Sequence, residues 1–103
     1  MGRVLQIAEK EIVRREILEM CGMAAPEGVS EKVIRAALKK EGCDMPEEEI
    51  LRQADYLSGK GMLSVIRIKN PGLGIHRTVM KITPVGTDYL EGNMEAAAGI
   101  GEG

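Results

Sequence analysis

The chain has 103 residues, 44% of them hydrophobic and 29% charged, and its formal net charge at pH 7 is −2. This length and composition suit one globular domain with a modest core. The longest runs without a charge are far shorter than the roughly 20 apolar residues that span a bilayer. The start, "MGRVLQIAEKEIVRRE", lacks the apolar middle of a signal peptide. We therefore expect one soluble, cytoplasmic domain that does not enter a membrane.

Cysteines, aromatic residues and the single histidine narrow the class of protein further. Cys21 and Cys43 form neither a CxxC pair nor a dense framework, so we expect reduced thiols in an intracellular protein. The only aromatic residues are Tyr56 and Tyr89, whereas sheets that read single-stranded nucleic acid usually offer stacking rings. His76 has no carboxylate, cysteine or second histidine nearby in sequence, and no metal-ligand spacing is present. We expect no metal, no cofactor and no enzymatic activity.

The first predicted element is a long helix near the N-terminus. Its apolar residues recur at helical spacing and are Leu5, Ala8, Ile12, Val13, Ile17 and Met20. Gly22 is predicted to end this helix as a left-handed C-cap. Leu5 and Ile7 lie ahead of the point where a compact domain would need the helix to begin. They serve either a partner helix in a homodimer or the monomer's own core, and the sequence leaves both uses open.

Two further helices follow a break at "MAAPEGV". Ser30 is predicted to cap the helix "EKVIRAALKKE", with Val29 and Ile34 as a hydrophobic staple and Gly42 at its end. The third helix, "PEEEILRQADYLSGKG", begins with a proline at a favoured first-turn position. Its three glutamates complement the positive end of the helix. The residues that it is predicted to bury are Ile50, Leu51, Ala54 and Leu57.

From Met62 the apolar period changes from helical to two, which is typical of strands. Two such runs joined by "NPGLGIH" predict a β-hairpin with His76 exposed at its tip and a loop longer than the two-residue type. We expect four cations on one solvated face, namely Arg67, Lys69, Arg77 and Lys81, opposite Ile66, Ile68, Met80 and Ile82. After the hairpin, Thr83 is predicted to cap a short helix that starts at Pro84.

This order of elements resembles a winged-helix domain. "ADYLSGKGML" (54–63) is similar to the stretch where the family's third helix ends in a leucine, a charged turn and a glycine. "KITPVGTDYLEG" (81–92) is similar to the "LTxxG" step that closes many wings. The resemblance implies an α+β fold over residues 1–92, a winged helix-turn-helix with three helices, a β-hairpin wing and a short C-terminal helix. Residues 93–103 are predicted to be a disordered tail. Length and ending also resemble small proteins of Mu-like prophages.

In winged-helix domains the third helix usually enters the major groove, and the wing follows the backbone or the minor groove. Residues 56–87 hold five basic and no acidic side chains, whereas residues 1–55 hold nine basic and twelve acidic ones. Such a basic segment is suited to neutralising phosphates. We expect a small transcriptional regulator whose partner is double-stranded DNA. Its expected DNA-binding residues are Arg52 and Gln53 at base edges, with Lys32, Arg35, Lys39, Arg67, Lys69, His76, Arg77 and Lys81 on or near the phosphates.

The third helix departs from this pattern. Its predicted outward positions are Glu48, Glu49, Arg52 and Gln53, and the two glutamates would be repelled by phosphates. Glutamates at this point also have a purely structural use, because they stabilise the N-terminus of a helix. The alternative function is therefore a non-catalytic winged-helix module for protein interaction or dimerisation. In that case the acidic third helix and the basic wing are complementary patches for a protein partner or a second copy of the chain.

Overall fold

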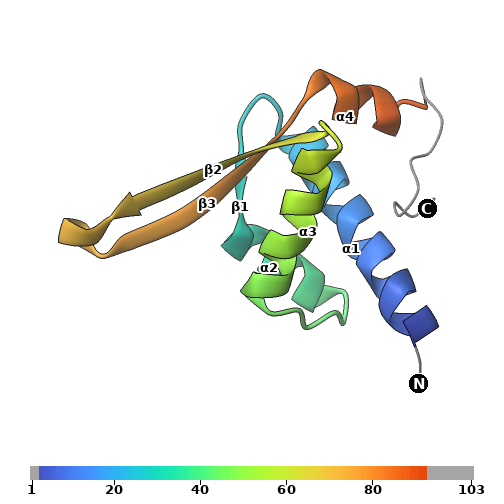
Figure 1. Cartoon of the computed structure of the whole chain (residues 1–103), viewed down its shortest axis with the longest axis horizontal. Helices are drawn as coiled ribbons and strands as arrows, with labels where there is room; N and C mark the ends of the chain where they lie inside the picture. The colour runs from blue at the N-terminus through green and yellow to red at the C-terminus, as the bar shows by residue number, and fades with distance from the viewer. Residues whose placement is uncertain (1–2, 93–103) are drawn as a thin grey trace.

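The computed structural model describes residues 3–92, with side chains described from Glu9 onward (Figure 1). Its elements, in order, are α1 (Arg3–Ala24), β1 (Val29–Ser30), α2 (Glu31–Lys40), α3 (Glu47–Gly59), β2 (Leu63–Asn70), the 3-10 turn η1 (Pro71–Leu73), β3 (Ile75–Ile82) and α4 (Pro84–Leu90). The predicted tail, residues 93–103, and the side chains of Leu5 and Ile7 lie outside the described part.

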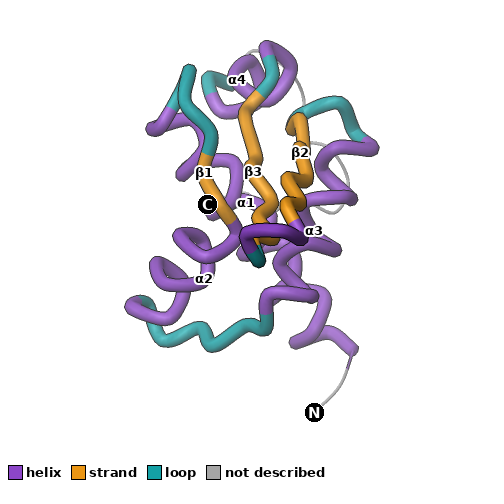
Figure 2. The backbone as a smooth tube through the Cα atoms, turned by 90° about the vertical axis from the view of Figure 1, so that its left-hand side faces the viewer, coloured by secondary structure: helices purple, strands orange, loops and turns teal. Residues whose placement is uncertain are grey.

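The core lies where α1, α2 and α3 meet the base of the hairpin. Ile17 on α1, Ile34 on α2 and Leu57 on α3 have no exposed surface, and Met80 on β3 joins them from the sheet. The three strands are antiparallel in the order β1-β3-β2, and Figure 2 shows them side by side. Beyond its base, the hairpin of β2 and β3 projects away from the helices (Figure 1). The fold thus combines a helical body with a long β arm.

Local capping residues explain why the elements begin and end where they do. The hydroxyl of Ser30 accepts a hydrogen bond from the backbone N–H of Val33 at 3.4 Å, which confirms the predicted cap of α2. The helix is followed by Gly42, whose φ of +86° is readily adopted only by glycine. Thr83 caps α4 in the same way as Ser30 caps α2, by accepting from the backbone N–H of Gly86 at 3.1 Å. These boundaries were predicted correctly.

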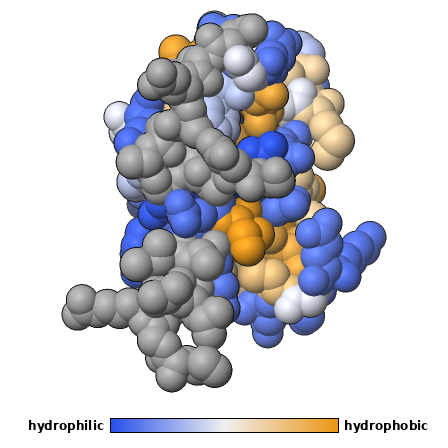
Figure 3. Space-filling model, turned by 90° about the vertical axis from the view of Figure 1, so that its right-hand side faces the viewer, coloured by the Kyte–Doolittle hydropathy of each residue, from blue (hydrophilic) through white to orange (hydrophobic). Residues whose placement is uncertain are grey.

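Three details of the helices were predicted wrongly. Gly22 does not end α1, which continues to Ala24, and Gly22 has no positive φ. Its lack of a side chain serves packing instead, because a Cβ there would lie 2.9 Å from Cδ1 of Leu90 on α4. Ile12, one of the residues counted in the helical apolar pattern, is 58% exposed and so does not share the buried face of α1. Figure 3 views the molecule from the side of α1 and shows hydrophobic surface interrupted by hydrophilic residues. Pro46 occupies the N-cap of α3 rather than its first turn.

The hairpin pairs its strands in a register that contradicts the predicted distribution of charge. Arg67 lies opposite Thr78, and Ile68 lies opposite Arg77. Directly opposed residues in an antiparallel pair project from the same face. Arg67 therefore shares a face with Thr78, which is buried, whereas Arg77 shares the opposite face with Ile68. The prediction of four cations on one face is wrong.

The loop length is the cause of this difference. Four residues separate the paired Asn70 and Ile75, and a loop with one residue more or fewer would exchange the faces of one strand relative to the other. We call the face that packs on the helices the inner face; its residues are Leu63, Val65, Arg67, Lys69, His76, Thr78, Met80 and Ile82. The outer face carries Ser64, Ile66, Ile68, Asn70, Ile75, Arg77, Val79 and Lys81. Two of the cations lie on each face.

The two cysteines are free, as predicted, and lie in different environments. Cys21 is buried, and burial raises the pKa of its thiol to about 11. The pKa of Cys43 is also raised, first by partial burial and then by the carboxylates of Glu9 and Asp44. Cys43 nevertheless keeps some exposed surface.

This contrast predicts the order of thiol modification. At mildly alkaline pH a disulfide reagent should modify Cys43 first, because only the thiolate reacts and Cys21 is both buried and protonated. The reaction is followed by the absorbance of the thiolate that the reagent releases, with and without denaturant. A Cys43→Ala variant should react only when unfolded, and rapid reaction of the folded variant would contradict the burial of Cys21.

Candidate nucleic-acid interface

One stripe of α3 faces outward. It consists of Glu48, Arg52 and Asp55, which follow one another at helical spacing and are all exposed. Gln53, which was predicted to face outward and read bases, is only 2% exposed. That prediction is wrong, since a buried amide cannot reach a base edge. Asp55 was missed, although its spacing from Glu48 places it on the same stripe.

Gln53 is buried because it links α3 to α1. Its side-chain carbonyl accepts from Nε of Arg14 at 2.6 Å, and its amide nitrogen donates to Oε1 of Glu49 at 2.8 Å. The other carboxylate oxygen of Glu49 forms an ion pair with Arg52. The side chain of Glu49 is only 18% exposed, so it too does not face outward as predicted. Of the four predicted outward residues, Glu48 and Arg52 are confirmed.

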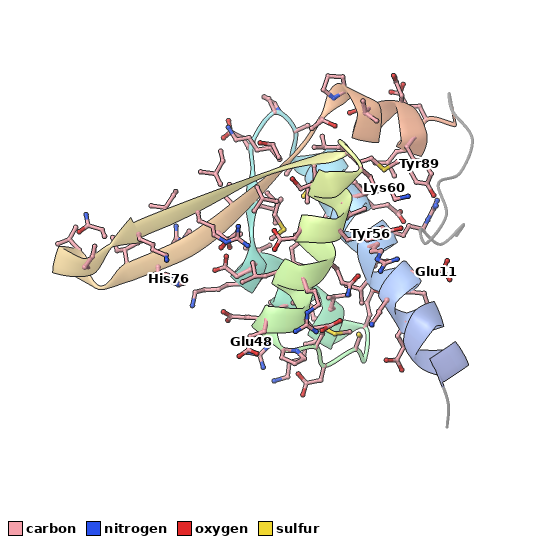
Figure 4. All side chains as sticks on the ribbon, viewed as in Figure 1. Glu11, Glu48, Tyr56, Lys60, His76 and Tyr89 are labelled. Carbon is pink, nitrogen blue, oxygen red and sulfur yellow. The ribbon has the colours of Figure 1, made fainter. Side chains whose placement is uncertain are left out.

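A groove of about 320 Å³ separates α3 from the inner face of the hairpin. It is lined by Glu31, Arg35, Pro46, Glu47, Glu48, Leu51, His76 and Thr78. Figure 4 shows His76 on the hairpin and Glu48 at the start of α3, on opposite sides of this space. Both side chains are exposed, which confirms the predicted exposure of His76. Leu51, predicted to be buried, is only partly buried at the edge of the groove.

A buried carboxylate fixes the hairpin to α2 at the back of the groove. Glu31 is 3% exposed and accepts a hydrogen bond from the backbone N–H of Thr78 at 2.6 Å. Strand β1 pairs with β3 only through Val29 and Ser30, so on the side of β3 away from β2 no strand residue lies opposite Thr78. The side chain of Glu31, the first residue of α2, thus replaces the missing strand partner.

The arginines around the groove are all held in ion pairs. Nη2 of Arg67 lies 3.2 and 3.1 Å from the two carboxylate oxygens of Asp55, which ties the hairpin to α3. Arg52 pairs with Glu49, and Arg35 lies 3.9 Å from carboxylate oxygens of both Asp44 and Glu47. By contrast, five of the predicted DNA-binding cations have no carboxylate within 4.0 Å in the part of the chain described: Lys32, Lys39, Lys69, Arg77 and Lys81.

The structure brings together most, but not all, of the predicted DNA-binding residues. Lys32, Arg35 and Lys39 share one face of α2, because they are spaced by three and four residues. Inner-face Arg67, Lys69 and His76 lie on the side of the hairpin that faces α3, where Arg67 pairs with Asp55 and His76 lines the groove. Arg77 and Lys81 project from the outer face. Gln53 is excluded by burial.

The arrangement as a whole matches a solved structure. A PadR-like transcription factor from Bacteroides fragilis superposes with a TM-score of 0.70 over 89% of this chain and 85% of that chain, at 18% sequence identity. The fold is a winged helix. The fold prediction is thus confirmed, and the hairpin of β2, η1 and β3 is the wing. No protein-family model and no curated protein matches the chain, and the resemblance to prophage proteins stays a prediction.

Neither a metal-binding cluster nor a membrane-spanning helix is found among the described residues. Within residues 3–92, no three His, Cys, Asp or Glu side chains are grouped so as to hold a metal ion. No helix in that range is both long and apolar enough to cross a membrane.

Proposed function

We propose that this winged-helix chain is a transcriptional regulator that binds double-stranded DNA. The observation that carries the proposal is the charge of the wing, because the hairpin, residues 63–82, holds four basic and no acidic side chains and projects from the body. Phosphates attract such a segment even though the net charge of the chain is −2, since the local distribution of charge governs the encounter.

The geometry favours DNA on the side of α3 and of the inner face of the wing. Lys69 is the inner-face cation without a carboxylate partner among the described residues, and Lys32 and Lys39 extend the basic surface along α2. These lysines are suited to phosphates. Arg52, exposed on α3, is suited to a base edge in the major groove.

A titration of random duplex DNA at several salt concentrations, followed by fluorescence anisotropy, tests the proposal. Each neutralised phosphate releases counterions, so the logarithm of the binding constant should fall linearly with the logarithm of the salt concentration, with a slope of about −0.9 per contact. An absence of binding even at low salt would overturn the proposed function.

Two lysines of the wing provide a matched test of the docking side. Lys69→Ala should weaken binding to all sequences about equally and reduce the salt slope by roughly one, because Lys69 lies on the inner face. Lys81→Ala removes the same charge from the outer face and should leave the slope unchanged. The reverse result would place the DNA on the outer face.

The outer face of the wing favours a second function, that of a protein-interaction module. Ile66, Ile68 and Ile75 are 44%, 45% and 43% exposed on this face, and neighbouring exposed apolar residues often mark an interface. The partner in this second function would be another copy of the chain. Sedimentation of the parent and of Ile68→Ser should then differ, with the variant shifted toward the monomer; equal sedimentation would exclude a dimer through this face.

A further inference from the structure

Two neighbouring glutamates of α3 occupy different environments. Glu48 is exposed, and no hydrogen bond or ion pair joins its side chain to any other described residue. The side chain of Glu49 is 18% exposed, and both of its oxygens are engaged. Oε1 accepts from the amide of Gln53 at 2.8 Å, and Oε2 forms the ion pair with Arg52. The same residue type is thus a free surface charge at one position and a fixed acceptor at the next.

The position of Glu49 is determined from inside the protein. The side-chain carbonyl oxygen of Gln53 accepts a hydrogen bond from Nε of Arg14 at 2.6 Å. The amide nitrogen of Gln53 must therefore point toward Glu49. Arg14 is held in turn by the ring of Tyr56, whose centroid lies 3.7 Å from its guanidinium carbon. Lys60 also approaches this ring, at 5.4 Å (Figure 4). Rotation of Glu49 would leave the buried amide without its acceptor.

This chain of contacts ends at an exposed arginine. The side chain of Arg52 is 68% exposed and contacts Glu49 through Nη1, whereas its Nε and Nη2 make no hydrogen bond or ion pair with a described residue. Arginine reads guanine through two parallel hydrogen bonds, which require a fixed orientation of the guanidinium plane. An arginine that is already ordered in the free protein loses less side-chain entropy on binding.

We propose that Glu49 is a positioning residue that orients Arg52 for base recognition, supported by Gln53 and Arg14. The inference rests on the proposed DNA-binding function and reverses the role expected for Glu49 from the sequence. Glu49 does not act as a surface charge that opposes DNA, since its carboxylate is paired with Arg52. Glu48, which lacks such a partner among residues 3–92, retains that opposing role.

The adjacent glutamates allow a matched experiment with full-length protein. The parent first selects a preferred sequence from a random duplex pool, and the affinities of Glu48→Gln and Glu49→Gln for that sequence and for random duplex are then measured. Glu48→Gln should bind both DNAs more tightly and leave their ratio unchanged. Glu49→Gln should reduce the ratio by about fivefold or more, the discrimination expected of a bidentate arginine. Arg52→Ala should reduce it equally, and the double variant should reduce it no further.

Further variants and readouts separate the possible failures. If Glu49→Gln behaves like Glu48→Gln, the positioning role is wrong while the DNA-binding function stands. If the parent binds no DNA, the proposed function fails, and so does the role in base recognition. The contact can then still be checked by NMR in the free protein, where Glu49→Gln but not Glu48→Gln should shift the side-chain Nε–H signal of Arg52.

Arg52→Lys covers the case in which Glu49→Gln does not fold. It keeps the positive charge and lies at an exposed position, but it removes the planar fork of donors. It should therefore lose the preference for the selected sequence and keep the salt slope of the parent. Unchanged preference would show that no oriented guanidinium is used.

Discussion

Replacing Leu57 with alanine should lower the free energy of unfolding by about 2–5 kcal/mol. Leu57 has no exposed surface and lies in the core with Ile50, Met62 and Ile17. The expected loss combines the removed apolar contacts with the cost of the cavity that remains. It is large for a domain whose total stability is expected to be about 5–15 kcal/mol. Chemical denaturation of parent and variant measures this loss, provided that the unfolding free energy depends on denaturant concentration with the same slope in both proteins.

Leu73→Ala is the matched control. It makes the same change at the tip of the wing, where the leucine is 73% exposed, and should leave the midpoint of unfolding nearly unchanged. If Leu57→Ala and the control unfold at the same denaturant concentration, α3 does not pack against the core as the structure shows.

Replacing Gly86 with alanine should also destabilise the domain, by about 3 kcal/mol, the upper end of the usual range for overpacking. A Cβ at this position would lie 2.4 Å from the carbonyl oxygen of Met62 and 2.7 Å from Cγ1 of Ile82. The nearer atom belongs to the backbone at the start of the wing, so it cannot move aside cheaply. The gain in helix propensity from glycine to alanine, about 1 kcal/mol, is too small to compensate. Thermal unfolding measures the difference.

Gly59→Ala provides the comparison for this prediction. Gly59 is the last residue of α3, has no positive φ, and no atom lies within 4 Å of a Cβ built on it. Alanine there should be neutral or should stabilise the domain by up to about 1 kcal/mol. A Gly86→Ala variant as stable as Gly59→Ala would mean that α4 does not approach the base of the wing so closely.

The order of elements could be predicted because each boundary has a local cause. Ser30 and Thr83 are capping residues followed by helical patterns, and the apolar period changes to two at Met62, where β2 is about to begin. The register of the wing has no such local signal. Alternation along β2 and β3 defines two faces for each strand, but the number of loop residues decides which faces coincide. Cations such as Arg67 and Arg77 were therefore placed together although they project from opposite faces.

The candidate interface was predictable only where exposure follows from helical spacing. Arg52 and Glu48 satisfy that condition. Gln53 lies next to Ala54 in the buried arc of α3, although counting helical positions placed it on the outward side. The buried carbonyl oxygen of Gln53 accepts its hydrogen bond from Arg14, which is 39 positions away in sequence, so no local pattern reveals the pair. Polar side chains that hydrogen-bond across helices are thus the ones that periodicity misplaces.

The position of β2 at the edge of the sheet has a consequence for solubility. The strand order β1-β3-β2 leaves one side of β2 without a described strand partner, and Figure 1 shows the arm extending away from the body. Open edges of this kind invite another chain to pair with them and aggregate, and charged side chains on the edge oppose such pairing. Arg67 and Lys69 project from this strand. Arg67 is paired with Asp55, so Lys69 is the one of the two whose charge is left among the described residues to keep wings apart at high protein concentration, and its loss should favour aggregation whether or not DNA is present.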